Sequence, residues 1–377
     1  MTKPAVIGIS VLVSCFTLVA CGGSNSGNST GGGGGSFTGT PVYVSNSSSP
    51  LVSFYLLDST SGALQRGSGS PVSTGGSTPD SLAVDPAKKF LLVSNPSSAN
   101  ISVFNVNITT AALSAVSGSP FAAGASAARL IVHPKGNFVY ALSSTPAEIL
   151  AYSFDSTTGA LASLSGFPLS LSASGQSGLA ISPNGQFLYT SNPNTNLITG
   201  FSIGTDGTLT QLAATTSPSK GSPVFLTFDS SGSFLFAVNA GGNLGGPSVS
   251  TFSISAAGAL TEVAGSPVTV GTAPVSAVFS QGFLYVLNQT SGTISAFAVT
   301  SSTGQLTELK GSPFTVGAHP VSLTTAALGK FLIATATGTS ASGSIAVFSI
   351  AADGTLTGVT GSPFTPDTAT PDQVLAF

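Results

Sequence analysis

The sequence predicts an all-β fold, a seven-bladed β-propeller whose blades have four strands each. A phrase built around Gly-Ser-Pro occurs seven times, at intervals of 46 to 50 residues. A period of this length, filled with short apolar strands, is typical of propeller blades. Four strand-like segments fit into one interval, and the last residues of the chain match the strand that the first interval lacks.

The Gly-Ser-Pro phrase marks the same point of every repeat. Its copies are Gly69-Ser70-Pro71, Gly118-Ser119-Pro120, Gly166-Phe167-Pro168, Thr216-Ser217-Pro218, Gly265-Ser266-Pro267, Gly311-Ser312-Pro313 and Gly361-Ser362-Pro363. Two other all-β architectures fit this spacing less well. An outer-membrane barrel has longer strands, and tandem sandwich domains need about 100 residues each, twice the observed period.

The last full repeat shows how four strands fit into one period. Residues 320–325 are predicted to form a short apolar strand, and residues 330–335 a fully buried strand. Residues 343–350 alternate as a half-buried strand does, and Asp353-Gly354 provide a turn before a last short strand at residues 355–357. Four strands and three turns make up one propeller blade.

Aromatic residues recur at two positions of the repeats. The first set lies in the buried second strands and contains Phe90, Phe138, Phe187, Phe234, Phe283 and Phe331. The second set lies in the third strands and contains Tyr55, Phe104, Tyr152, Phe201, Phe252, Phe297 and Phe348. Flat rings fill the space between stacked blades, so we assign these residues to packing and not to binding.

The two ends of the chain are predicted to share the first blade. The chain enters the fold at residues 41–46, which match a second strand, and nothing upstream provides a first strand. Residues 371–377 align with the first strands at residues 79–82 and 320–323, so they should complete the first blade. Ring closure of this kind removes two open sheet edges.

The first 36 residues are predicted to lie outside the propeller. Residues 1–20 have one charge, Lys3, followed by an apolar run, which is typical of an export signal. Cys21 follows Leu-Val-Ala in a stretch that resembles the lipobox of bacterial lipoproteins, in which the cysteine carries the lipid. Residues 21–36 are rich in Gly, Ser and Asn and should form a flexible tether. We therefore expect the domain at residues 37–377 to be anchored by lipid in the cell envelope, at the outer membrane, on either its periplasmic or its surface face.

The composition excludes several classes of function. Charged residues make up 6% of the chain and the formal net charge is −3, so nucleic acid binding is not expected. The second cysteine, Cys15, lies inside the predicted signal, so the mature domain has no disulfide. We find neither a set of metal ligands nor a phosphate-cradling glycine loop. The sequence therefore predicts a monomer without a metal or a cofactor.

The strand and turn phrases resemble those of a known family. Residues 41–46, 187–192 and 283–288 are PVYVSN, FLYTSN and FLYVLN, and Thr-Gly-Ala-Leu type turns occur at residues 61–64 and 158–161. These phrases resemble the Tyr-Val-Thr-Asn (YVTN) repeats of bacterial surface propellers and the seven-bladed lactonase family, which includes 6-phosphogluconolactonase. The resemblance covers residues 37–377 and implies the propeller fold. It also implies a lactonase activity that uses His, Glu and Arg residues around the central channel.

Four polar residues interrupt the repeat where the innermost strands begin. Asp80 and Asp372 occupy one equivalent position in adjacent blades, Arg129 lies one blade further on, and His319 directly precedes an innermost strand. An aspartate could activate water, Arg129 could hold an oxyanion or an anionic group of the substrate, and His319 could be a second acid or base. Alternatively, the aspartates cap strand ends and Arg129 pairs with one of them. His133 is predicted to be an exposed turn residue.

Two functions are consistent with these observations. The first is a lipid-anchored binding or scaffold module that presents a polar, weakly charged face to a protein or glycan. The alternative is a hydrolase of a lactone or related cyclic ester. The tether and the scarcity of ionisable residues favour the first, whereas the family resemblance and the four candidate residues favour the second. A phosphorylated sugar lactone would be a poor substrate, because few Lys and Arg residues are present to bind phosphate.

Overall fold

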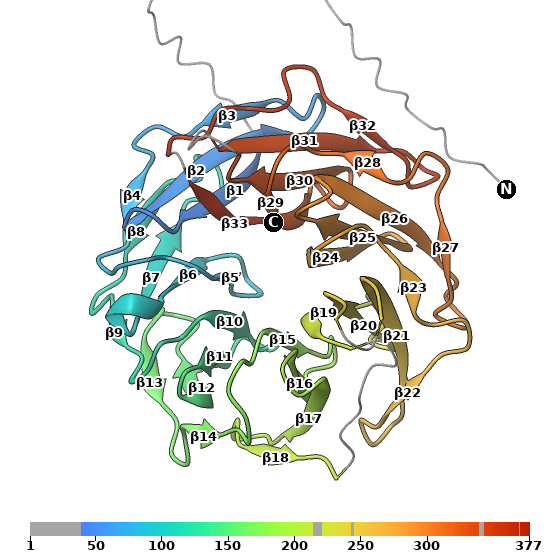
Figure 1. The fold of residues 1–377 in the computed structure, drawn as a ribbon. Helices are drawn as coiled ribbons and strands as arrows, with labels where there is room; N and C mark the ends of the chain where they lie inside the picture. Colours follow the sequence, from blue (N-terminus) through green and yellow to red (C-terminus); the bar gives the residue numbers. More distant parts are fainter. Residues whose placement is uncertain (1–38, 214–220, 243–244, 339–342, 369) are drawn as a thin grey trace, which may run out of the picture. The chain divides into compact units, whose positions relative to one another are not determined.

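The structure is a computed structural model that describes residues 39–213, 221–242, 245–338, 343–368 and 370–377. These residues belong to the unit Phe37–Phe377 and form seven antiparallel sheets, arranged as the blades of a propeller (Figure 1). The predicted export signal at residues 1–20, Cys21, the tether and the repeat phrase at residues 216–218 lie outside the described residues. In the described part of the chain, no helix is long and apolar enough to cross a membrane.

Each blade has four main strands, named here from the innermost to the outermost. Blade 1 contains β33 (Pro371–Ala376), β1 (Gly39–Asn46), β2 (Leu51–Asp58) and β3 (Leu64–Arg66). Blade 2 contains β5 (Leu82–Val84), β6 (Phe90–Asn95), β7 (Asn100–Val106) and β8 (Leu113–Ala115). Blade 3 contains β10 (Arg129–Val132), β11 (Phe138–Ser144), β12 (Ala147–Phe154) and β13 (Leu161–Ser163). Blade 4 contains β15 (Gly178–Ile181), β16 (Phe187–Asn192), β17 (Leu197–Ile203) and β18 (Leu209–Gln211).

The remaining three blades follow the same order. Blade 5 contains β19 (Pro223–Phe228), β20 (Phe234–Asn239), β21 (Ser248–Ile254) and β22 (Leu260–Glu262). Blade 6 contains β24 (Pro274–Ser280), β25 (Phe283–Asn288), β26 (Thr293–Val299) and β27 (Leu306–Glu308). Blade 7 contains β29 (Pro320–Ala326), β30 (Phe331–Ala336), β31 (Ser344–Ile350) and β32 (Leu356–Gly358). The strands of blade 7 begin and end within one residue of the predicted positions.

A few short elements complete the blades. In five of them a two-residue strand pairs with the third strand: β4 (Val72–Ser73), β9 (Phe121–Ala122), β14 (Leu169–Ser170), β23 (Val268–Thr269) and β28 (Phe314–Thr315). A short 3-10 helix, η1 (Pro96–Ser98), connects β6 to β7. Neighbouring innermost strands contact one another in the order β33, β5, β10, β15, β19, β24 and β29, and β29 contacts β33. Figure 1 shows these strands around the centre of the ring.

The last strand of the chain closes the ring, as predicted. β33 pairs antiparallel with β1, so that Leu375 lies opposite Tyr43 and Val374 opposite Val44. The ring of Phe377 stacks on Tyr43 with their centroids 5.6 Å apart. Blade 1 is therefore built from both ends of the described chain, and its innermost strand comes from the C-terminus.

The repeated serine of the Gly-Ser-Pro phrase completes the third strand of its own blade. In blade 1, β2 pairs with β3 at Tyr55–Leu57 and with β4 at Leu51–Val52, which leaves the N–H of Phe54 between the two partners. The Ser70 hydroxyl accepts a hydrogen bond from this N–H at 2.8 Å. Equivalent bonds join Val103 to Ser119, Thr251 to Ser266, Ala296 to Ser312 and Val347 to Ser362. The phrase recurs because these five blades have the same third-strand donor to satisfy.

The tyrosines of the second strands bind neighbouring blades together. Their hydroxyl groups donate to backbone carbonyls of turns 67 to 69 residues further along the chain, at distances between 2.7 and 3.0 Å. The four pairs are Tyr43 with Ala111, Tyr140 with Gly207, Tyr189 with Gly258 and Tyr285 with Gly354. Each ring is buried while its polar end is bonded, which is the favourable way to bury a tyrosine. These four second-strand tyrosines are thus structural residues.

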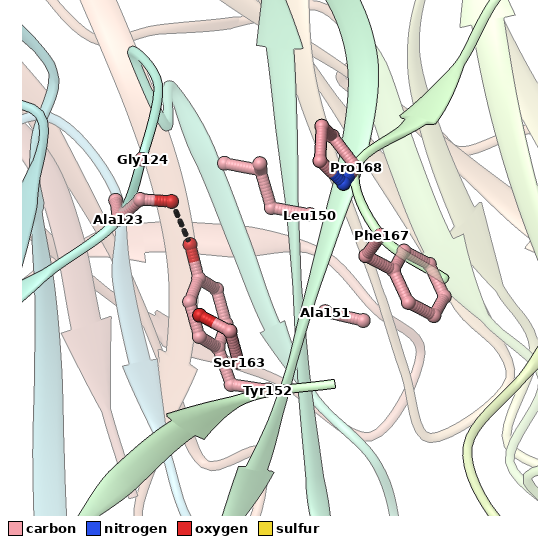
Figure 2. Close-up of a pocket in the computed structure, with 8 residues that line it drawn as sticks. All are labelled: Ala123, Gly124, Leu150, Ala151, Tyr152, Ser163, Phe167 and Pro168. Atoms are coloured by element: carbon pink, nitrogen blue, oxygen red, sulfur yellow. Dashed lines mark hydrogen bonds between the residues drawn. The ribbon is translucent and has the colours of Figure 1, made fainter. Parts of the chain in front are cut away.

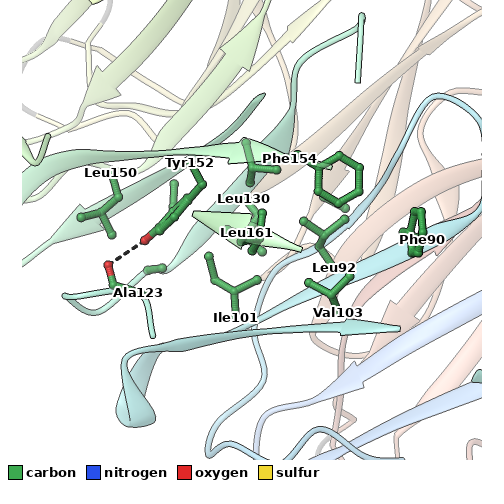
Figure 3. Close-up of a cluster of buried hydrophobic side chains, with 14 of the residues drawn as sticks. Phe90, Leu92, Ile101, Val103, Ala123, Leu130, Leu150, Tyr152, Phe154 and Leu161 are labelled. Carbon is green, nitrogen blue, oxygen red and sulfur yellow. Dashed lines mark hydrogen bonds between the residues drawn. The ribbon is translucent and has the colours of Figure 1, made fainter. Parts of the chain in front are cut away.

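Apolar side chains fill the interfaces between blades. Between blades 2 and 3, Phe90, Leu92 and Val103 of one blade pack against Tyr152 and Phe154 of the next (Figure 3). The rings of Phe90 and Phe154 meet edge to face with their centroids 5.7 Å apart. This arrangement confirms that the recurring aromatic residues pack between blades.

Candidate active site

The innermost strands begin around a cavity of about 100 Å³. Its lining residues come from six blades and lie at or near the first positions of the innermost strands. They are Asp80, Arg129, Phe225, Val275, Ser276, Val321, Ser322, Leu323, Asp372 and Gln373. Three of the four predicted site residues, Asp80, Arg129 and Asp372, therefore meet in one cavity.

Equivalent hydroxyl groups of the preceding blades hold the two aspartates. The Ser45 hydroxyl of β1 donates to the backbone carbonyl of Asp80 at 2.8 Å. The Thr335 hydroxyl of β30 donates to the backbone carbonyl of Asp372 at 2.5 Å. Ser45 and Thr335 occupy the same position of their second strands, and neither is exposed. The repeat therefore places the two carboxylates at equivalent positions in adjacent blades.

Arg129 is the first residue of β10, on the other side of Asp80 from Asp372. Its guanidinium Nη1 lies 3.9 Å from Asp80 Oδ1. This distance is too long for a hydrogen bond, and the two side chains are 36% and 32% exposed. The pair is therefore open to solvent and to a ligand, and its guanidinium donors are not used up by the aspartate.

The cavity keeps one carboxyl group close to the protonation midpoint at neutral pH. The pKa of Asp372 is raised to about 6, chiefly by burial and next by the charge of Asp80, while Arg129 and the Ser47 hydroxyl act in the opposite direction. Burial also raises the pKa of Asp80, and Arg129 opposes that rise. Two carboxylates beside one guanidinium titrate as a coupled set. A group with a pKa near 6 can both accept and return a proton at physiological pH.

His319 does not line this cavity. It lies immediately before β29, and its side chain is exposed. Its backbone φ of +52° matches that of Thr78, Ser222 and Ala273, which also directly precede a proline at the beginning of a repeat. The conformation of His319 is thus a feature of the repeat, and the position lies in the loop before the innermost strand.

The sequence as a whole matches the model of one protein family. The match to "Lactonase, 7-bladed beta-propeller" covers residues 36–128, 109–244 and 242–372. The chain belongs to this lactonase family. A comparison with curated protein sequences found no match.

Solved structures with the same fold include proteins that are named as lactonases. A candidate 6-phosphogluconolactonase from Bacteroides uniformis is 19% identical, with a TM-score of 0.76 over 90% of this chain and 99% of its own. One from Bacteroides fragilis is 18% identical, with a TM-score of 0.74 over 90% and 98%. The periplasmic gluconolactonase of Pseudomonas aeruginosa is 17% identical, with a TM-score of 0.70 over 89% and 98%. At these identities the comparison shows a shared fold.

A second cavity of this lactonase-family propeller lacks such a group of charges. This cavity of about 120 Å³ lies between blades 2 and 3 and is lined by Leu150, Ala151, Phe167, Pro168 and four further residues (Figure 2). The Tyr152 hydroxyl at its edge already donates to the carbonyl of Ala123 at 2.6 Å. Its lining contains no ionisable group except this bonded phenol, so it offers no acid–base chemistry.

His133 is buried, and the prediction of an exposed turn residue is wrong. Its Nδ1 accepts from the N–H of Lys135 at 3.2 Å, and its Nε2 lies 2.9 Å from the carbonyl of Gly185 in the next blade. The neighbouring turn covers the ring so closely that a side chain at Gly185 would clash with it. Both ring nitrogens are used, so His133 joins blades 3 and 4.

The sequence left several lining residues without a role, Phe225, Ser276 and Gln373 among them. Phe225 and Ser276 share the register of Arg129, because each lies opposite the fifth residue of its blade's second strand. Gln373 aligns with them in the sequence repeat. The repeat alignment places all of them, but it does not show which side chains reach the cavity. Within the described residues, no group of three or more His, Cys, Asp and Glu side chains is placed to hold a metal ion.

Proposed function

We propose that this protein hydrolyses a small lactone at the cavity formed by Asp80, Arg129 and Asp372. The observation that carries the proposal is the convergence of two carboxylates and one guanidinium from three adjacent blades. Membership of the lactonase family supports it. It was the alternative interpretation of the sequence, and it is now preferred to the binding or scaffold module.

The reaction needs a base, a cation and a proton donor. The Asp372 carboxylate takes a proton from water as the water oxygen bonds to the lactone carbonyl carbon. Arg129 stabilises the negative charge that develops on the carbonyl oxygen. The ring C–O bond then breaks, and the leaving oxygen takes the proton from Asp372. The product is the open hydroxy acid, and the carboxylate is restored.

The charges of the cavity favour an uncharged substrate. Arg129 is the one cation among the described lining residues, and it faces Asp80 and Asp372. A phosphate dianion would meet two carboxylates and a cation that they already neutralise. We therefore propose an unphosphorylated sugar lactone, as in the name of the gluconolactonase neighbour.

Hydrolysis of glucono-1,5-lactone by the wild-type protein is expected to increase with pH around a midpoint near 6. Asp372 must lose its proton to act as the base, and its pKa is about 6. The measurement is acid release in weakly buffered solution between pH 5 and 7.5, with the spontaneous rate subtracted at each pH. Absence of activity over this range on both sugar and aliphatic lactones would contradict the proposal and favour the binding module.

Asp80→Asn is expected to move this midpoint to lower pH while activity remains measurable. The negative charge of Asp80 raises the pKa of Asp372, so its removal lets Asp372 ionise at lower pH. The same assay gives the midpoint of the variant. A midpoint that moves upward would show that the titrating group is not Asp372 beside Asp80.

Arg129→Ala is expected to lower kcat/KM by roughly 10²–10³-fold, the usual effect of removing one oxyanion donor. The remaining activity should have a higher pH midpoint, because Arg129 lowers the pKa of Asp372. Arg66→Ala is the matched control, since Arg66 is the other arginine of the chain and pairs with Asp367 in blade 1, outside the cavity. Equal losses in the two variants would argue against a direct role for Arg129.

A further inference from the structure

One cavity residue, Gln373, has a longer side chain than the serines at the equivalent position of other blades. Gln373 aligns in the sequence repeat with Ser81 in blade 2 and Ser322 in blade 7. The N–H groups of Gln373 and Ser81 both donate to a serine hydroxyl of the second strand in their blade. The Ser81 hydroxyl accepts from the N–H of Leu130 at 3.0 Å, and the Ser322 hydroxyl accepts from the N–H of Val374 at 3.2 Å. In both cases the hydroxyl accepts from a backbone N–H of the next blade's innermost strand, at equivalent positions of the repeat.

Gln373 does the same with its amide oxygen. Its Oε1 accepts from the N–H of Leu82, the equivalent donor in blade 2. Its backbone is also fixed, because its N–H donates to the Ser45 hydroxyl at 3.1 Å and that hydroxyl donates to the carbonyl of Asp80. The hydrogen bond that this position makes in other blades is therefore formed without the amide nitrogen of Gln373.

The amide nitrogen of Gln373 is not needed for this structural role. A carboxamide has one oxygen acceptor and one NH₂ donor group, and the bond from Leu82 fixes which end points at the backbone. Within the described residues, Nε2 has no hydrogen-bond partner, and Gln373 lines the cavity beside Asp372. A serine at this position would satisfy the N–H of Leu82 but would present no such donor.

We propose that Gln373 Nε2 binds the lactone carbonyl oxygen and, with Arg129, stabilises the oxyanion. This inference rests on the proposed function, because it assigns a further catalytic residue to the same cavity. The carbonyl oxygen accepts from the NH₂ group in the ground state, and the bond strengthens as negative charge develops on that oxygen. A neutral donor suits an uncharged substrate next to two carboxylates, since it adds no charge to the cavity.

Gln373→Ser tests the proposal, because it places in blade 1 the residue that blades 2 and 7 use at this repeat position. The expected result is a fall in kcat on the order of 100-fold with an unchanged thermal unfolding temperature. KM should change little, because the bond is strongest in the transition state. The measurement is kcat and KM on glucono-1,5-lactone at pH 7, beside a thermal unfolding curve.

Two further variants make the result decisive. Ser81→Ala removes an equivalent bond between blades at a residue that does not line the cavity, and it should retain full kcat. Gln373→Glu retains an oxygen acceptor for Leu82, loses the NH₂ donor and adds a negative charge, so it should lose activity and raise the pH midpoint of Asp372. The added charge raises that midpoint whatever the role of Gln373, so the decisive readout is a loss of kcat that persists at high pH, where Asp372 is ionised.

The outcomes separate this inference from the proposed function. An active wild type whose Gln373→Ser variant retains kcat within about twofold overturns the role of Gln373 and leaves the lactonase proposal standing. An inactive wild type overturns both. If Gln373→Ser fails to fold, Gln373→Glu decides, because it retains the bond to Leu82.

Discussion

Asp372→Asn is expected to lower kcat for lactone hydrolysis by roughly 10²–10⁴-fold, the usual contribution of a positioned general base. The amide has nearly the shape of the carboxyl group but cannot take a proton from water. The bond from Thr335 goes to the backbone carbonyl of Asp372 and is unaffected. The loss of activity should therefore occur without a loss of structure, as measured by kcat at pH 7 and by the unfolding temperature.

The stability of this variant is a second readout. Because the folded-state pKa of Asp372 is raised to about 6 from the usual 3.8, the folded state binds the proton more tightly than the unfolded state does. The contribution of Asp372 to stability is thus present below pH 4 and is lost as the pH rises through 6. At pH 7 Asp372→Asn should unfold at the same or a higher temperature than the wild type.

Asp353→Asn is the matched control for this substitution. Asp353 lies in an exposed turn of blade 7, where its carboxylate accepts from the N–H and the hydroxyl of Thr355. These bonds hold the pKa of Asp353 below the ordinary value. Replacing this carboxylate should therefore lower the stability of the folded protein and leave its activity unchanged. If both variants lost activity equally, or if Asp372→Asn retained it, Asp372 would not be the base.

The fold could be predicted because the repeated phrase meets the same structural requirement in five of the blades. Ser70, Ser119 and their equivalents satisfy the same third-strand N–H in their blades, so the spacing of the phrase is the spacing of the blades. Ring closure was predictable for the same reason. Residues 371–377 carry the first-strand pattern, and β1 has the edge that they pair with.

Only those site residues that differ from the other residues at their repeat position could be predicted from the sequence. Asp80, Arg129 and Asp372 were found because they place charges where other blades have apolar or small residues. His319 also departs from the repeat, but it precedes the strand and remains outside the cavity. The burial of His133 depends on Gly185 of the next blade, and the role of Gln373 depends on the N–H of Leu82. Such contacts between blades are not contained in the pattern of a single repeat.

The hydroxyl groups that hold the site also belong to the scaffold. Ser45 is bonded to the backbone of both Asp80 and Gln373, so one buried residue of β1 sets the distance between two functional positions. The cavity is thus positioned by strands that would be in place without any activity. This separation explains how a propeller can change its chemistry by substituting a few residues at strand beginnings.

Deletion of residues 371–377 is expected to abolish the cooperative folded state. The deletion removes the innermost strand of blade 1 and exposes the edge of β1, which then offers unpaired N–H and carbonyl groups for aggregation. It also removes the packing of Val374, Leu375 and Phe377 against neighbouring blades. Full burial of three such side chains would contribute roughly 5–9 kcal/mol. Leu375 and Phe377 are partly buried, so the loss is smaller than this but still a large fraction of the stability of a domain. Size-exclusion chromatography and thermal unfolding measure this effect.

Removal of Phe377 alone is the graded control for this deletion. It leaves the pairing of β33 with β1 intact and removes the ring that stacks on Tyr43, so it should cost roughly 1.5–3 kcal/mol. The protein should remain monodisperse and retain lactonase activity, because Phe377 does not line the cavity. A longer deletion that still unfolded cooperatively near the wild-type temperature would show that the other six blades hold the ring without closure. In that case β33 would matter only for carrying Asp372 and Gln373 into the cavity, and the deletion would abolish activity but not folding.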